Sequence, residues 1–132
     1  MIVTGKVVDE YDKPIKGFAL NMYGTDNKFF RVDITFNTNS LTDTNGMYRL
    51  WQVIPDETDI IDIDMTQGAE FIAGGILTNS RGEALSDSFG ILDCAIYFQL
   101  DSSYREISGS DYTIPSSDYG KTITLNYQLR KK

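Results

Sequence analysis

The sequence predicts an all-β protein, folded as a Greek-key β-sandwich of about seven or eight strands. Short segments in which apolar and polar residues alternate are separated by turns rich in Gly, Pro, Asn and Asp, the pattern of half-buried strands. No window of about eleven residues or more has the spacing of an amphipathic helix. Apolar and polar residues alternate along these strands, whereas the strands of a parallel sheet are apolar on both faces. The pattern therefore favours two sheets whose apolar sides face each other over a parallel sheet.

The first expected strand covers residues 2–8, where apolar and polar side chains alternate. A turn over residues 9–14 follows, because Asp12 bonds its own backbone and Pro14 presets φ. A second strand over residues 17–23 should then return beside the first strand or opposite it.

The next strand is expected over residues 30–36, and its apolar face consists of Phe30, Val32, Ile34 and Phe36. Residues 37–45 are rich in Asn, Thr and Ser and predict a loop. A strand over residues 48–54 follows and ends before Pro55, which cannot donate a backbone hydrogen bond.

The middle of the chain begins with an acidic turn at residues 56–59, after which the core side of a strand is formed by Ile61, Ile63 and Met65. Residues 70–78 contain Gly74 and Gly75, which predict a bulge or a close backbone approach. Residues 79–90 are expected to form a polar loop.

The last third begins with a strand over residues 91–100, whose apolar face consists of Leu92, Cys94, Ile96, Phe98 and Leu100. Residues 101–120 predict a long connection with a short edge strand near residues 112–114. A final strand over residues 122–129 places on one face Ile123, Leu125, Tyr127 and Leu129. No linker or internal repeat divides the chain, so residues 1–132 are expected to form a single domain.

Composition limits the possible partners. The 41% of hydrophobic residues is typical of a globular protein. The 12 basic and 19 acidic residues give a net charge of -7, which repels nucleic acid. No segment approaches the roughly 18 apolar residues of a membrane span, and residues 1–4 lack the features of a signal peptide. The protein is therefore either cytoplasmic or presented without its leader.

Catalysis is not expected. The chain has no histidine, which removes the commonest general base and the commonest zinc ligand. Paired carboxylates could serve a glycosidase, but no pair stands out among the 19 acidic residues. The single cysteine, Cys94, lies in an apolar strand and is expected to be a small buried side chain without a disulfide partner. No cofactor is expected.

Two motifs in residues 3–50 resemble the carboxypeptidase regulatory-like family of transthyretin-like β-sandwich domains, which are related to immunoglobulin-like folds. The first motif contains Gly5, Val7, Asp9, Pro14, Ile15 and Gly17, and the second contains Thr42, Asp43, Gly46, Tyr48 and Leu50. Asp12 stands where the family often has Gly, and residues 55–120 are longer and more irregular than in the compact module.

The resemblance implies a non-catalytic module. Such domains lie beside peptidase domains, at the front of outer-membrane nutrient transporters and in small bacterial envelope lipoproteins. The expected function is therefore a structural or protein-interaction module of a bacterial cell-envelope protein. Its location would be extracytoplasmic, with a leader and lipid-bearing cysteine that precede the given sequence.

Two ligand-binding alternatives remain open. A calcium site could draw its oxygen ligands from an acidic group whose spacing matches no EF-hand and is equally typical of a solvated turn: Asp56, Glu57, Asp59, Asp62 and Asp64. A surface glycan could stack on exposed aromatic residues, foremost Trp51, Tyr97 and Tyr104, with Tyr23, Tyr112 and Tyr119 as further candidates. Aromatic side chains in strands also serve packing. An isopeptide bond between Lys6 and Asn126 is disfavoured because both side chains are expected on outward faces.

Overall fold

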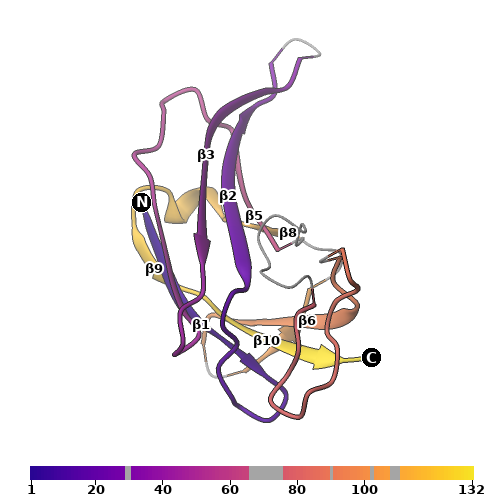
Figure 1. The fold of residues 1–132 in the computed structure, drawn as a ribbon. Coiled ribbons are helices and arrows are strands. Elements are labelled where there is room, and N and C mark those ends of the chain that lie inside the picture. Colours follow the sequence, from indigo (N-terminus) through magenta and orange to yellow (C-terminus); the bar gives the residue numbers. More distant parts are fainter. Residues whose placement is uncertain (29–30, 66–75, 90, 102, 108–110) are drawn as a thin grey trace.

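The computed structural model describes residues 1–28, 31–65, 76–89, 91–101, 103–107 and 111–132, and these form a β-sandwich of two sheets (Figure 1). The all-β prediction is confirmed. The described residues form ten strands, more than expected, and a 3₁₀ turn, η2 (Ser116–Asp118): β1 (Ile2–Asp9), β2 (Ala19–Asp26), β3 (Asp33–Leu41), β4 (Met47–Trp51), β5 (Ile60–Asp64), β6 (Cys94–Gln99), β7 (Arg105–Glu106), β8 (Asp111–Thr113), β9 (Thr122–Thr124) and β10 (Asn126–Lys131).

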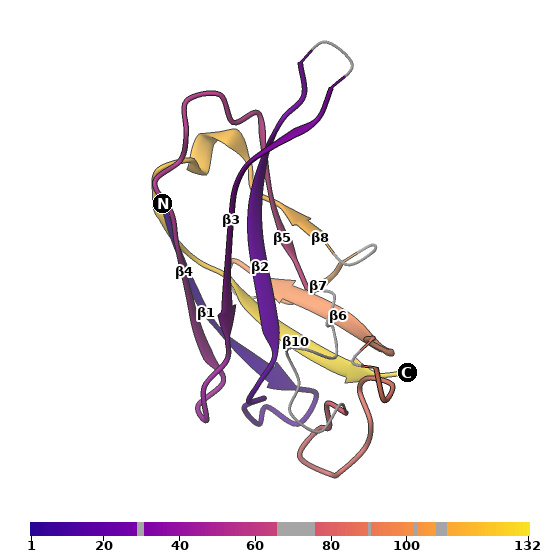
Figure 2. The ribbon, with the colours of Figure 1, turned by 45° about the horizontal axis from the view of Figure 1, so that its top comes forward.

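The two sheets are named here after their inner strands. The β1 sheet has the order β4-β1-β10-β6-β7, and β9 also pairs with β1. The β2 sheet has the order β3-β2-β5-β8 and is antiparallel throughout. Consecutive strands such as β1 and β2 lie in different sheets, as Figure 2 shows. The strand expected beside or opposite the first therefore lies opposite it, which is typical of a Greek-key sandwich.

The core lies between the two sheets, and both sheets contribute one face to it. Fully buried side chains of the β1 sheet include Val3, Val7 and Leu129, and those of the β2 sheet include Leu20, Met22, Ile61 and Ile63. The expected core face of Ile61, Ile63 and Met65 is confirmed.

The expected last strand is divided at Leu125 into β9 and β10, both parallel to β1. Leu125 N donates to Thr4 O at 2.8 Å, and the Tyr48 hydroxyl donates to Leu125 O at 2.5 Å. Asn126 Oδ1 accepts from the backbone N–H of Lys6 at 2.9 Å. The break between β9 and β10 is thus stabilised by side chains from β4 and β10. The side-chain oxygen of Asn126 is bonded to the backbone of Lys6, whereas the Lys6 side chain is exposed.

The prediction for residues 30–45 was wrong in two respects. The expected loop at residues 37–45 is strand as far as Leu41, because these polar residues pair with β2. The register shifts by one between Gly24 and Thr25, so that Thr35 is an extra residue in β3. Because this bulge reverses the faces, Phe36 is buried whereas Ile34 is 67% exposed. Phe30 lies outside the described residues.

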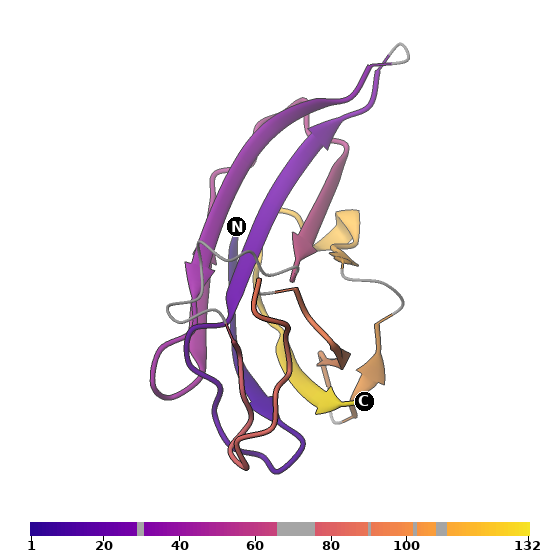
Figure 3. The same ribbon diagram turned by 45° about the vertical axis from the view of Figure 1, so that its right-hand side comes forward.

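The β2–β3 hairpin rises beyond the rest of the sandwich, as Figure 3 shows from the side. We call its projecting part, residues 25–28 and 31–34, the arm. The arm meets the loop before β5: Asp59 N donates to Thr25 O at 2.8 Å, and Asp59 Oδ2 accepts from Asn27 N at 2.9 Å. At the bulge, the Thr35 and Thr58 hydroxyls lie 2.7 Å apart.

Smaller differences concern strand ends. The strand expected over residues 48–54 ends at Trp51. β6 ends at Gln99, so Leu100 is exposed and not part of the apolar face. The expected edge strand near residues 112–114 is confirmed as β8. The bulge predicted at Gly74 and Gly75 lies outside the described residues.

Asp12, in the turn after β1, has a φ of 60°, a conformation that favours glycine. An aspartate tolerates this left-handed conformation better than most residues do.

Two core tyrosines should respond in opposite ways to replacement by phenylalanine. The Tyr48 hydroxyl satisfies the buried carbonyl of Leu125, so Tyr48→Phe should destabilise the protein by about 1–2 kcal/mol. The Tyr127 hydroxyl is buried without a hydrogen-bond partner among the described residues, so Tyr127→Phe should leave stability unchanged or raise it by up to about 1 kcal/mol. Urea unfolding compares the two variants, and an equal loss in both would refute this difference.

Candidate functional site

Asp9 is the hub of a polar cluster at the end of β1. Its carboxylate is fully buried, and Oδ1 accepts from the backbone N–H groups of Tyr11 and Lys13 at 2.8 and 3.0 Å. Oδ2 accepts from Ser80 N at 2.8 Å. One carboxylate thereby shapes the turn over residues 9–14 and ties it to the turn at residues 79–83.

The hydrogen-bond donors around Asp9 determine whether its carboxyl group is ionised. Burial raises the pKa of the carboxyl, but the hydrogen bonds from Ser80, Lys13 and Tyr11 outweigh burial and hold this pKa below its ordinary value. Asp9 is therefore ionised at neutral pH and acts as an anionic structural acceptor.

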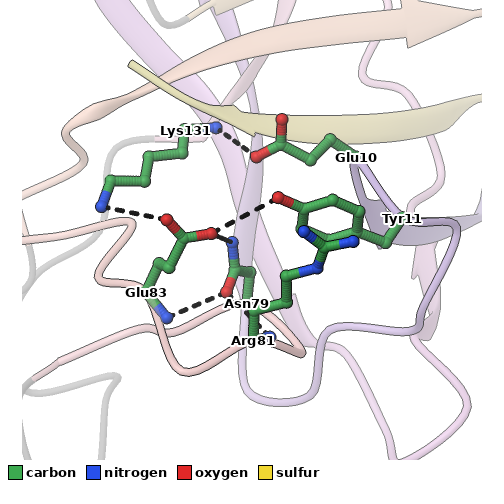
Figure 4. A network of polar contacts seen from close by, with 6 residues as sticks. All are labelled: Glu10, Tyr11, Asn79, Arg81, Glu83 and Lys131. Atoms are coloured by element: carbon green, nitrogen blue, oxygen red, sulfur yellow. Dashed lines mark hydrogen bonds and ion pairs between the residues drawn. The ribbon is translucent and has the colours of Figure 1, made fainter.

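Glu83 continues the cluster across the end of the sandwich (Figure 4). Its Oε1 accepts from Asn79 Nδ2 at 3.1 Å and from the Tyr11 hydroxyl at 3.4 Å, and its Oε2 lies 3.3 Å from Lys131 Nζ. The Arg81 guanidinium lies over the Tyr11 ring, 3.7 Å from its centroid. These contacts join the turn after β1, the turn at residues 79–83 and β10, so we call this cluster the clasp.

Asp9→Asn should destabilise the protein by about 2 kcal/mol at pH 7, because an amide nitrogen cannot accept one of the three backbone N–H groups. The folded-state pKa of Asp9 is lowered, so its stabilisation is present above the unfolded pKa of about 3.9 and is lost as pH falls through the folded pKa. The free energies of unfolding of wild type and variant should therefore converge below about pH 4. Urea titrations at neutral and acid pH check this, and a constant difference at every pH would contradict it.

The acidic residues proposed for calcium are distributed over a turn and one strand. Asp56 and Glu57 lie exposed in the turn before β5, whereas Asp62 and Asp64 point outward from β5. The Thr113 hydroxyl donates to Asp62 Oδ1 at 2.5 Å. The expected group is thus divided, and only its β5 members share a sheet face.

Two further residues of the β2 sheet, Asp111 and Tyr23, are paired with the outward acidic residues of β5. Asp111 of β8 lies directly opposite Asp64, and the Tyr23 hydroxyl of β2 donates to Asp111 Oδ2 at 3.2 Å. Burial raises the pKa of Tyr23 to about 12, with a further contribution from the charges of Asp111 and Asp62. Burial raises the pKa of Asp111 as well, and the neighbouring Asp64 raises it further.

Asp111 was not singled out from the sequence, because it belongs to an irregular connection whose pairing partner is far away in the chain. Only the register of β8 on β5 brings it to the acidic face. Among the residues with described positions, no three or more His, Cys, Asp or Glu side chains are arranged to hold a metal ion. Calcium binding stays a prediction, which a calcium titration of the melting temperature can test.

The proposed glycan-binding aromatic residues do not converge. Trp51 is exposed and pairs with Ile2 at the start of β1. Tyr97 pairs with Gln128, which itself pairs with Val8, so the two aromatic residues are about 20 Å apart along the strand direction alone. The Arg130 guanidinium also lies 3.7 Å from the centroid of the Tyr97 ring and covers one face of it.

The other aromatic candidates have structural contacts. Burial raises the pKa of Tyr104, the charge of Asp12 raises it further, and the charge of Arg130 lowers it. The Tyr112 ring packs against Phe98 with 5.1 Å between centroids, and the Tyr119 hydroxyl donates to Asp59 O at 3.1 Å. Cys94 is buried, and burial raises the pKa of its thiol to about 11, so it is not an activated nucleophile.

Comparison with known proteins identifies no family. No family model matches the chain, and no curated protein matches it. A solved structure to which the chain is similar is that of the major plantain pollen allergen Pla l 1, with 16% identity and a TM-score of 0.42 over 100% of this chain and 94% of that chain. Within the described residues, no helix has the length and apolar character needed to cross a membrane.

Proposed function

We propose that this protein is a non-catalytic protein-interaction module of a bacterial cell-envelope protein. The observation that carries the proposal is the arm, which presents apolar side chains away from the core. Val32 and Ile34 are 68% and 67% exposed. Thr25 of β2 is paired with Ile34 of β3 on one side and with Ile60 of β5 on the other, so these three residues lie side by side across the sheet. Apolar side chains grouped on a projecting element are typical of a contact surface for another protein.

The arm is held in place before any partner binds. Its two strands are paired as far as Asp26 and Asp33, and its base is bonded to Asp59. The bulge at Thr35 turns Ile34 outward, and bulges of this kind commonly re-aim side chains for function. A pre-organised arm loses little conformational entropy on binding, which favours affinity.

The polar groups favour binding over catalysis. The strongly bonded carboxylates Asp9 and Glu83 serve the clasp, and the thiol of Cys94 is buried. The envelope location rests on the resemblance of residues 3–50 to the carboxypeptidase regulatory-like family. Osmotic-shock fractionation of cells that express the complete gene tests this location, and recovery of the protein in the cytoplasmic fraction would refute it.

A photo-crosslinking residue placed at position 34 tests the interaction. Irradiation of producing cells should give a discrete adduct of higher mass from position 34. The matched control is position 91, because Ile91 is also an exposed isoleucine and lies outside the arm, where its backbone N–H donates to Asp87 Oδ1 at 3.0 Å. No adduct from position 34, or the same adducts from both positions, would reject the arm as a contact surface.

A further inference from the structure

The first strand and the last two strands run parallel to each other in the β1 sheet. β9 pairs with the start of β1, where Ile2 lies opposite Thr122. β10 pairs with the end of β1, where Val7 lies opposite Tyr127, and in both pairs the partner is 120 positions later in the chain. The two segments therefore keep a single register along about 23 Å of β1. We call this pairing of β1 with β9 and β10 the shear ladder.

The parallel direction of these strands determines how tension acts on them. Met1 lies at the start of β1 and Lys132 follows the end of β10, so the two ends of the chain lie at opposite ends of the ladder (Figure 2). Tension applied through residues 1 and 132 draws β1 and β10 past each other along their own axes. The hydrogen bonds of the ladder lie across this direction. They are therefore loaded together and must break together.

The ladder is bridged between β9 and β10, where the regular pairing is interrupted. Leu125 N donates to Thr4 O at 2.8 Å. One position further along, Asn126 replaces a backbone acceptor with its side chain, since its Oδ1 accepts from Lys6 N at 2.9 Å. The interruption is thus crossed by hydrogen bonds and is not a weak point.

Both ends of the ladder are closed by further bonds between the same parts of the chain. At one end, Ile2 N donates to Lys121 O at 3.0 Å. At the other end, Lys131 N donates to Glu10 Oε1 at 3.1 Å, and Lys131 Nζ lies 3.3 Å from Glu83 Oε2 in the clasp. Tension at either end therefore meets these contacts before it reaches the middle of the ladder.

The ladder is also shielded from water. Fully buried side chains line its core side: Val3, Val7, Leu125, Tyr127 and Leu129. On its outer side, Val8 and Gln128 are only 7% exposed, and Gln128 Nε2 donates to Asp9 O at 3.2 Å. Water replaces a stretched hydrogen bond only where it has access, so this cover keeps the bonds strong under load.

From the parallel ladder, its bridged interruption and its closed ends, we infer a mechanical function: the shear ladder lets the protein carry tension between residues 1 and 132 without unfolding. This inference goes beyond the proposed interaction function and does not depend on it. The arm belongs to the β2 sheet and lies outside the ladder. A protein under tension therefore keeps the arm in place.

Single-molecule pulling on the full chain tests the inference by comparing two directions of load. In the shear direction, handles are attached at residues 1 and 132. In the unzipping direction, they are attached at residue 1 and at Val53→Cys, because Val53 is exposed whereas the native Cys94 is buried. Val53 follows Gln52, whose N–H donates to Met1 O beside the start of the antiparallel pair of β1 and β4, so this load breaks bonds one after another. The unfolding force should be about threefold higher in the shear direction.

Asn126→Ala separates a role in the ladder from a general effect on stability. It removes the bond to Lys6 N, so the unfolding rate at constant force should rise about fivefold in the shear direction. In the unzipping direction, unfolding begins at Ile2, before the bond of Asn126 is loaded, and the rate should not change. The matched control is Asn39→Ala, which removes an exposed asparagine of β3 in the other sheet and should change neither rate.

Three results would overturn the inference. The first is an equal unfolding force in the two directions. The second is an unchanged unfolding rate of Asn126→Ala in the shear direction. The third is an equal rise of that rate in both directions, which would make Asn126 a stabilising residue with no special part in resisting tension. The crosslink from position 34 is a separate measurement, so its failure would reject the arm as a contact surface and leave the shear ladder in place.

Discussion

Gly5→Ala is expected to destabilise the protein by about 3–5 kcal/mol, enough to unfold a domain of ordinary stability. A β-carbon at residue 5 would collide with the carbonyl of Leu125 and lie 2.9 Å from the Tyr48 ring. That carbonyl cannot easily move, because Leu125 is bonded to Thr4 through its N–H and to Tyr48 through its oxygen. Circular dichroism and urea unfolding measure the loss.

Gly120→Ala is the control for this substitution. Gly120 has a φ of 80°, but a β-carbon there meets no atom within 4 Å, so only backbone strain of about 1 kcal/mol is expected. A similar loss in both variants would show that the close approach of Leu125 to Gly5 is not what makes glycine necessary at residue 5.

Thr42→Val is expected to cost about 3 kcal/mol although the two side chains have nearly the same shape. The Thr42 hydroxyl is buried, donates to Ile15 O at 2.6 Å and accepts from Phe18 N at 2.9 Å. Valine would leave both backbone groups without these bonds in the core. This single hydroxyl links the segment that enters β2 to the turn that enters β4.

Thr42→Ser keeps the hydroxyl and loses only a methyl group, so about 1 kcal/mol should be lost. Thermal unfolding of the two variants separates the hydrogen bonds from the packing. If serine were as damaging as valine, the methyl group and not the hydroxyl would be the stabilising part of Thr42.

The sequence allowed the sandwich to be predicted because the core strands alternate cleanly. Ile61 and Ile63 are buried as expected, and Asp62 points outward between them. The motif residues Gly5, Asp9 and Thr42 proved to be structural: Gly5 leaves room for the carbonyl of Leu125, the Asp9 carboxylate accepts backbone hydrogen bonds, and the Thr42 hydroxyl joins two backbone segments.

The errors arose where pairing between distant strands overrides the local pattern. A bulge of one residue at Thr35 cannot be recognised from alternation, yet it exchanges the faces of Ile34 and Phe36. Gln128 was expected on a polar face but is buried, since its amide donates to Asp9 O across the sheet.

The candidate site was harder to predict from the sequence than the fold. Tyr23, Asp62 and Asp111 meet only through the register of β2, β5 and β8. Trp51 and Tyr97 seemed equivalent as exposed aromatic residues, but they lie in different strand pairs. The distance between two such side chains depends on the order of the strands in the sheet, which the composition and the spacing of residues do not reveal.

The pairing of the first strand with the last has a consequence for how the chain folds. The bond between Lys6 and Asn126 joins residues 120 positions apart, and β10 lies in the interior of its sheet between β1 and β6. A nascent chain in which residues 121–132 have not yet been made would expose the edges of both neighbouring strands. Closure of so large a loop slows folding, so the β1 sheet should be completed only after β10 has been synthesised, whereas the hairpin of β2 and β3 can form much earlier.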